Sequence, residues 1–119
     1  MTLQECYSAL GGDYEDAINR LRSDKILQKF VFKFLDDKGY GMLLESMEAK
    51  DYEEACRAAH SIKGVCQNLS FTKLFESSRN LNDALRSGYS PEVPDLMAKV
   101  EEDYQQTVEA IRKLQDDPA

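Results

Sequence analysis

The sequence contains no long hydrophobic run. Its most apolar stretch, residues 26–35, is interrupted by Lys29 and Lys33, whereas a membrane-spanning helix needs about 20 consecutive apolar residues. Residues 1–5 lack the basic and apolar regions of an export signal. We therefore expect a cytoplasmic protein that neither spans a membrane nor is secreted.

Basic residues are in the minority. The chain has 15 Lys and Arg against 22 Asp and Glu, which gives a formal net charge of -7. Nucleic acids and anionic membranes both bind cationic surfaces. The composition therefore argues against nucleic acid and membrane as partners.

Cysteine is also scarce. Cys6, Cys56 and Cys66 form an odd set without paired spacing, which is typical of reduced thiols in the cytosol. Cys56 and His60 are four residues apart, but two ligands do not make a metal site. We therefore predict no metal site. Cys56 and Cys66 are also better interpreted as small core residues than as nucleophiles.

The 119 residues are 42% apolar and 31% charged, a composition typical of one folded domain over residues 1–119. Every periodicity is helical, and no strand is predicted. The expected helices span residues 3–10, 13–22, 23 to about 38, 42–49, 51–69, 71–87 and 90–115. The short joints between them predict an all-α fold, an antiparallel four-helix bundle with additional short N-terminal helices.

Several residues are predicted to set the helix ends and faces. The expected N-caps are Asp13, Ser23 and Asp51. Gly39 and Gly41 should break the third helix, and Pro91 should occupy the first position of the last one. The predicted inward face of the third helix is Ile26, Leu27, Phe30, Phe34 and Leu35. That of the last helix is Leu96, Val100, Tyr104, Val108 and Ile111.

The helix over residues 51–69 has one unusual face. Its apolar stripe, spaced 4, 3, 4 and 3, consists of Ala55, Ala59, Ile62, Cys66 and Leu69. At 100° per residue, His60 points about 140° away from the centre of this stripe, and Gly64 about 180° away. Lys63 and Gln67 flank the same strip. The only histidine of the chain is therefore expected to be exposed at mid-helix, beside a lysine.

Gly64 is unexpected at this place. A glycine inside a helix costs about 1 kcal/mol relative to alanine, and an outward position offers no close packing in return. A bare backbone beside His60 leaves room for a partner to approach the imidazole. The alternative interpretation is a tolerated surface glycine next to a solvated histidine.

The helix over residues 71–87 supplies a second strip. Its core stripe is Phe71, Leu74, Ser78, Leu81 and Leu85. Arg79, Asn82 and Arg86 share one flank, and antiparallel packing through the joint at Ser70 can bring them to the height of His60. Lys63, Arg79 and Arg86 can then form a local cationic rim. A solvated charged face is the alternative.

These residues resemble the histidine-containing phosphotransfer (HPt) family. In the stretch AAHSIKGVCQNLSFTKL, His60, Lys63 and Gly64 match its signature of His followed by Lys and Gly at the third and fourth places. The likeness extends through DYEDAINRL, FKFLDD and MLLESMEAKDYEEACRAAH before the motif, and through LNDALRSG after it. It covers roughly residues 3–116, so the chain looks like a complete stand-alone module.

The resemblance implies a phosphoryl carrier and not an enzyme. The family's histidine accepts a phosphoryl group from an aspartyl phosphate on a receiver domain and passes it to another receiver in a two-component phosphorelay. Neutral imidazole is a nucleophile, and Lys63 can offset phosphoryl charge without rigid bidentate binding. The predicted phosphoacceptor is His60, and the predicted binding residues are Lys63, Gly64, Gln67, Asn82 and Arg86.

The catalytic machinery is expected to come from the partner. The chain has no Gly-rich ATP loop, no evident carboxylate cluster for Mg²⁺ and no second histidine. We therefore expect no intrinsic cofactor, with Mg²⁺ supplied by the receiver domain. The expected partners are receiver domains of response regulators, a hybrid histidine kinase, or both, and the chain is expected to be a monomer.

The sequence departs from the family at two places. Ser70 stands where members often have Gly, and we expect it to cap the next helix. Asn82 stands where members often carry Gln or Glu, which can hydrogen-bond the imidazole, and where chemotaxis-kinase domains are acidic. This favours a relay carrier over a chemotaxis-kinase-type phosphoacceptor domain. A non-phosphorylated docking or scaffold module remains an alternative, although intact His60, Lys63 and Gly64 argue against it.

Overall fold

The computed structural model describes residues 1–116, which are all helical apart from short joints and contain no strand. This confirms the predicted all-α fold. The elements are α1 (Leu3–Leu10), α2 (Tyr14–Leu21), α3 (Asp24–Lys33), the 3-10 turn η1 (Phe34–Asp36), α4 (Gly39–Glu48), α5 (Tyr52–Leu69), α6 (Thr72–Leu85) and α7 (Val93–Asp116). No helix in this part of the chain is long and apolar enough to cross a membrane.

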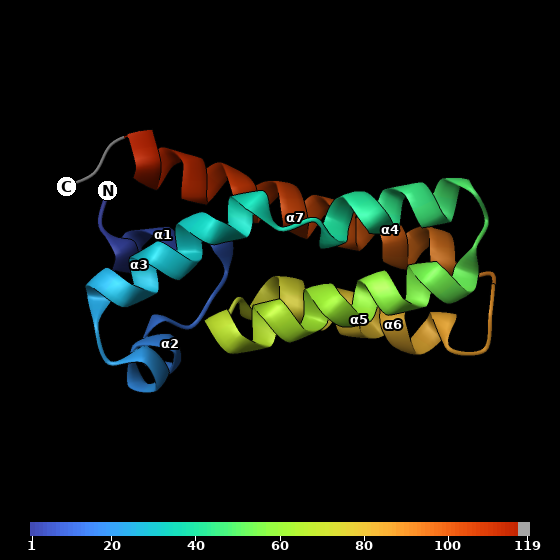
Figure 1. The fold of residues 1–119 in the computed structure, drawn as a ribbon, viewed down its shortest axis with the longest axis horizontal. Helices are drawn as coiled ribbons and strands as arrows, with labels where there is room; N and C mark the ends of the chain where they lie inside the picture. Colours follow the sequence, from blue (N-terminus) through green and yellow to red (C-terminus); the bar gives the residue numbers. More distant parts are fainter. Residues whose placement is uncertain (117–119) are drawn as a thin grey trace.

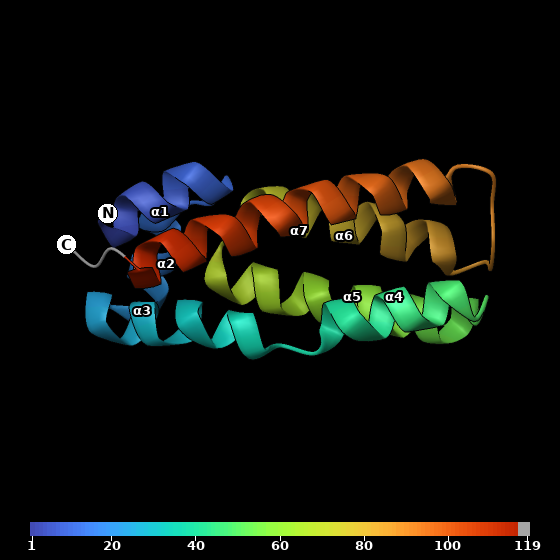
Figure 2. The same cartoon turned by 90° about the horizontal axis from the view of Figure 1, so that it is seen from above.

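Four helices form a bundle at one end of the elongated molecule. The helix α5 packs on α6 and α4, and α7 packs on α6 (Figure 1). The other end holds α1, α2 and α3: α1 and α3 pack on α7, and α2 packs on α3 and α1. The helix α7 therefore runs through both ends. From above, α3 and α4 follow one another along the same edge (Figure 2).

The apolar stripes of α5 and α6 form the centre of the bundle. All ten residues predicted for these two stripes are buried. On α7, the predicted inward residues Val100, Val108 and Ile111 are buried, while Leu96 and Tyr104 are partly buried against the core. Because the stripes lock the rotation of α5, its opposite face is directed to solvent.

The side-chain caps of three helices are also confirmed. Asp13, Ser23 and Asp51 each accept a hydrogen bond from the backbone N–H three residues later, at 3.0, 3.3 and 3.2 Å. Such a bond satisfies one of the free N–H groups at a helix start. The helix α5 carries His60, and a local sequence signal, Asp51, therefore determines where this helix starts.

The break before α4 differs from the prediction. Gly39 and Gly41 do not end a helix: α4 begins at Gly39, whose N–H donates to Asp37 Oδ2 at 3.0 Å. Gly39 is buried, and a Cβ there would lie 2.9 Å from that oxygen and 3.1 Å from Ile62 Cγ1. The glycine thus lets the start of α4 approach α5 closely.

The predicted inward face of α3 was wrong at two positions. Ile26 and Phe30 are 46% and 43% exposed. The buried stripe is Leu27, Val31 and Phe34, spaced 4 and 3, and Leu35 is only partly buried. The reason is that α3 lies at an edge of the molecule and buries a narrower stripe than the sequence offers.

Two helix ends near the bundle were also predicted wrongly. Pro91 lies in a turn before α7, which begins at Val93. Ser70 does not cap α6: it ends α5 in the left-handed conformation, with φ 57°. This conformation favours glycine, but Ser70 adopts it here. Its hydroxyl donates a hydrogen bond to Asp16 Oδ2.

Candidate functional site

His60 lies in the middle of α5 on the face opposite the buried stripe, and it is exposed as predicted. Within residues 1–116, no side chain is hydrogen-bonded to its imidazole. The ring nitrogens are therefore accessible to an approaching molecule.

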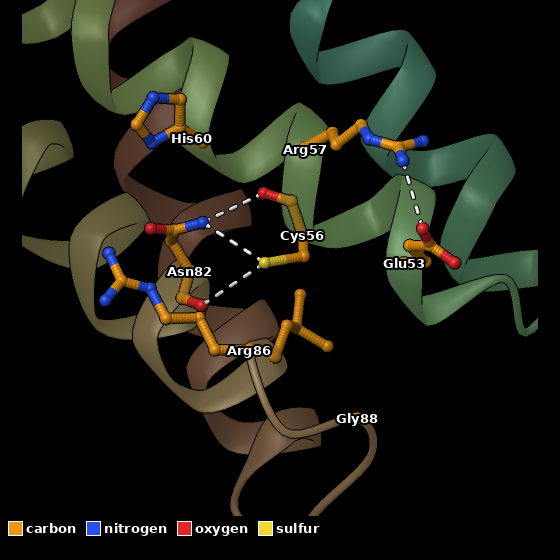
Figure 3. Close-up of a pocket in the computed structure, with 8 residues that line it drawn as sticks. Glu53, Cys56, Arg57, His60, Asn82, Arg86 and Gly88 are labelled. Atoms are coloured by element: carbon orange, nitrogen blue, oxygen red, sulfur yellow. Dashed lines mark hydrogen bonds and ion pairs between the residues drawn. The ribbon is translucent and has the colours of Figure 1, made fainter.

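A cavity of about 700 Å³ opens beside His60 between α5 and α6. Its other lining residues are Glu53, Cys56, Arg57, Asn82, Leu85, Arg86 and Gly88. Figure 3 shows the imidazole, the Asn82 amide and the Arg86 guanidinium along one side of this cavity. The structure thus brings together three of the predicted site residues, His60, Asn82 and Arg86.

Asn82 is not on the exposed flank of α6 where the sequence placed it, because it is only 2% exposed. Its Nδ2 donates to the backbone carbonyl of Cys56 at 2.9 Å and contacts Cys56 Sγ at 3.4 Å. The Cys56 thiol in turn donates to the carbonyl of Asn82 at 3.7 Å. Asn82 therefore joins α6 to α5 one turn before His60, and its amide nitrogen is not directed to the imidazole (Figure 3).

The surroundings of Gly64 are open. A Cβ built at this position meets no heavy atom within 4 Å, so nothing in this chain requires a glycine there for packing. Lys63 is half-buried and forms no ion pair with any residue of the described chain, while Gln67 is exposed. These three residues are on the His60 helix but do not line the cavity.

The charges around the cavity differ from the predicted cationic rim. Of Lys63, Arg79 and Arg86, only Arg86 lines the cavity; the guanidinium of Arg79 lies over the ring of Phe75, 5.6 Å from its centroid. The second cavity arginine is Arg57, which sequence reasoning missed. Its position three residues before His60 was the available signal, because such residues share a helix face.

Both cavity arginines have acidic partners in the structure. Arg57 pairs with Glu53 at 3.0 Å and with Glu54, and Arg86 lies 3.8 Å from Asp83. These side chains are 42–80% exposed, and exposed pairs of this kind contribute about 0–1 kcal/mol each. The guanidinium of Arg86, with a single long contact, is the easier of the two to redirect towards an anion.

Cys56 was also missed as a site residue. The sequence suggested a small core residue, but its side chain is half-buried and lines the His60 cavity. Its spacing of four residues from His60 placed it on the same face. No group of three or more metal-ligating side chains occurs in the described part of the chain.

Comparison with known proteins identifies the family. The family model described as Hpt domain matches residues 3–112, and the chain belongs to this family. No curated protein and no solved structure matches the chain. Hpt domains are phosphocarrier modules rather than catalysts, and they generally interact with receiver domains and histidine kinases. The protein therefore has a phosphotransfer-type role in two-component signalling.

Proposed function

We propose that His60 is the phosphoacceptor and that the chain carries a phosphoryl group from the aspartate of one receiver domain to that of another. The observation that carries this proposal is the imidazole itself, exposed at mid-helix and free of hydrogen-bond partners among residues 1–116. Membership of the Hpt family supports the same residue, because His60 is the only histidine in the chain.

The transfer needs little chemistry from this chain. The lone pair of Nε2, the ring nitrogen farthest from the backbone, attacks the phosphorus of the aspartyl phosphate. The bond from phosphorus to the aspartate oxygen breaks, the carboxylate leaves with the electron pair, and the proton on Nδ1 stays on the ring. The second half of the relay is the reverse step towards another aspartate.

The remaining predicted residues have supporting roles in this proposal. Lys63, three residues after His60, can reach a phosphoryl group on the imidazole and offset its charge. Gly64 leaves the approach open, while Gln67 and Arg86 offer polar contacts to the partner. We propose that Mg²⁺ is held by the receiver domain, because phosphoryl transfer depends mainly on positioning and charge stabilisation at the donor.

A second cleft supports docking of a receiver domain next to His60. It has a volume of about 430 Å³ and is lined on α5 by Val65, Asn68 and Leu69. Phe30 of α3, 43% exposed, forms part of its wall. Because Asn68 lies four residues after Gly64 and shares its helix face, a receiver that covers the open strip at Gly64 also reaches this cleft.

The neutral Asn82 favours a relay carrier over a chemotaxis-kinase-type phosphoacceptor domain. An acidic side chain at this position can hydrogen-bond the imidazole, whereas the Asn82 amide is engaged by the carbonyl of Cys56. A docking module that is never phosphorylated is the other alternative. It predicts receiver binding without a phosphoryl group on the chain.

The proposal is tested by phosphorylating the purified chain with phosphoramidate and, separately, with a panel of receiver domains charged by acetyl phosphate. The expected product is an acid-labile, base-stable label on His60. His60→Gln should fold normally, since His60 is exposed, and should take no label from either donor. Label retained on this variant would refute the assignment, and receiver binding without any label would favour the docking module.

A further inference from the structure

The three thiols of the chain lie in very different surroundings. Cys6 and Cys66 are fully buried, and burial raises the pKa of Cys6 to about 11 and raises that of Cys66. Both are thus protected from reagents in solution. Cys56 is half-buried and lines the cavity beside His60, so it is the thiol that a small molecule can reach.

The position of Cys56 couples it to the proposed phosphoacceptor. Residues four apart on a helix have Cβ atoms about 5–6 Å from each other, so a group attached to Cys56 stands next to the imidazole of His60. Cys56 also contacts the Asn82 amide through its sulfur and its backbone carbonyl. The Asn82 amide and carbonyl occupy one side of the sulfur (Figure 3), so a substituent on the sulfur extends into the cavity that Cys56 lines.

A second feature of the cavity indicates that it can hold a polar ligand. Asn82 is only 2% exposed. Its Oδ1 is buried and has no hydrogen-bond partner among the described residues. A buried acceptor of this kind is costly unless a donor reaches it. Arg57 and Arg86 line the same cavity, and their guanidinium groups suit carboxylates.

These features together favour an anionic ligand that carries N–H donors. We propose that Cys56 is a thiol-modification site, at which a small anionic peptide disulfide such as glutathione disulfide forms a mixed disulfide and suppresses phosphotransfer at His60. The site rests on the thiol and cavity geometry, and the suppression rests on the proposed function of His60. The peptide supplies amide donors for Asn82 Oδ1 and carboxylates for the arginines.

The reaction is a thiol–disulfide exchange. The Cys56 sulfur, as thiolate, attacks one sulfur of the reagent, and the S–S bond of the reagent breaks. One half remains on Cys56 as a mixed disulfide, and the other half leaves as a thiolate that takes up the proton lost by Cys56. The disulfide is the oxidant, so the step is balanced, and a small thiol reverses it.

The experiment treats the folded full-length chain with glutathione disulfide and locates the adduct by peptide mass spectrometry. Transfer from a phosphorylated receiver is then measured with and without treatment. We expect the adduct on Cys56, not on Cys6 or Cys66, and a transfer rate lower by about tenfold or more because the cavity beside the reacting group is filled. Dithiothreitol should restore the rate.

Cys56→Ser is the matched control, and the ratio of treated to untreated rate should be one for this variant. An adduct on Cys6 or Cys66 in place of Cys56, or an unmodified chain, would overturn the modification site. An adduct on Cys56 with an unchanged transfer rate would overturn the suppression. If the untreated chain takes no phosphoryl label, the proposed function of His60 fails, and the mapped position of the adduct still decides the thiol site.

Discussion

Replacing Gly64 separates the stability of α5 from its use as a docking strip. Gly64→Ala adds a methyl group at a helical position where a Cβ meets no heavy atom within 4 Å. No steric cost therefore opposes the gain in helix propensity, which is about 1 kcal/mol. For a chain of this size, that gain corresponds to a rise in Tm of about 4 °C.

Phosphotransfer should change in the opposite direction. If the bare backbone admits the receiver, the methyl group of Gly64→Ala should slow transfer from a phosphorylated receiver, and the longer side chain of Gly64→Gln should slow it further. Labelling of His60 by phosphoramidate should remain unchanged, because this small donor needs little room. The stability is measured by urea unfolding followed by circular dichroism, and both donors are compared on the same protein preparation.

Gly41 provides a matched control. It also lies within a helix, α4, and a Cβ there meets nothing within 4 Å. Gly41→Ala should therefore stabilise the fold without slowing transfer, although the gain is smaller so near a helix start. Equal losses with receiver and phosphoramidate in Gly64→Ala would indicate a distorted imidazole, and unchanged transfer from the receiver would make Gly64 a neutral surface residue. Either result would refute the docking argument.

Three further predictions concern charge, docking and pH. Lys63→Ala should slow transfer while changing the unfolding free energy by only about 0.5 kcal/mol, because Lys63 forms no ion pair in the described chain; a large fall in Tm with an unchanged transfer rate would make Lys63 structural. Phe30→Asp should weaken transfer from a receiver but not labelling by phosphoramidate, whereas Met42→Asp, at an apolar position that is 50% exposed outside the cleft, should affect neither. The buried thiols should make the unfolding free energy fall as pH rises above about 9. Because burial raises the pKa of Cys6 from 9.0 to about 11 and raises that of Cys66, the unfolded chain loses these protons first; pH-dependent urea unfolding of the wild type and Cys6→Ala should show a shallower fall in the variant.

The parts of the fold that depend on neighbouring residues in the sequence could be predicted. The caps at Asp13, Ser23 and Asp51 are formed by atoms three residues away. The stripes of α5 and α6 follow from helical periodicity, and the stripe of α5 places His60 on the outward face. Local signals therefore suffice for the exposed histidine and its helix.

The parts that depend on packing between helices could not be predicted. Asn82 borders the stripe of α6, and only the distance between α5 and α6 decides that it is buried against the carbonyl of Cys56. Phe30 has the same periodicity as a core residue, yet it is exposed because α3 lies at an edge. Ser70 looks like an N-cap in sequence, but it ends α5 in the αL conformation, and its hydroxyl donates to Asp16, 54 residues away, instead of capping α6.

The length of α7 has a consequence for how the molecule unfolds. This helix of 24 residues packs on α6 in its first half and on α1 in its second half. Loss of either end of the molecule would leave apolar residues of the same helix facing water. The free-energy cost of that exposure is about 25 cal/mol per Å² of apolar surface. The two ends are therefore coupled as one cooperative unit, and the histidine helix, although it is at the surface, shares the global stability of the whole chain and not that of a local hairpin.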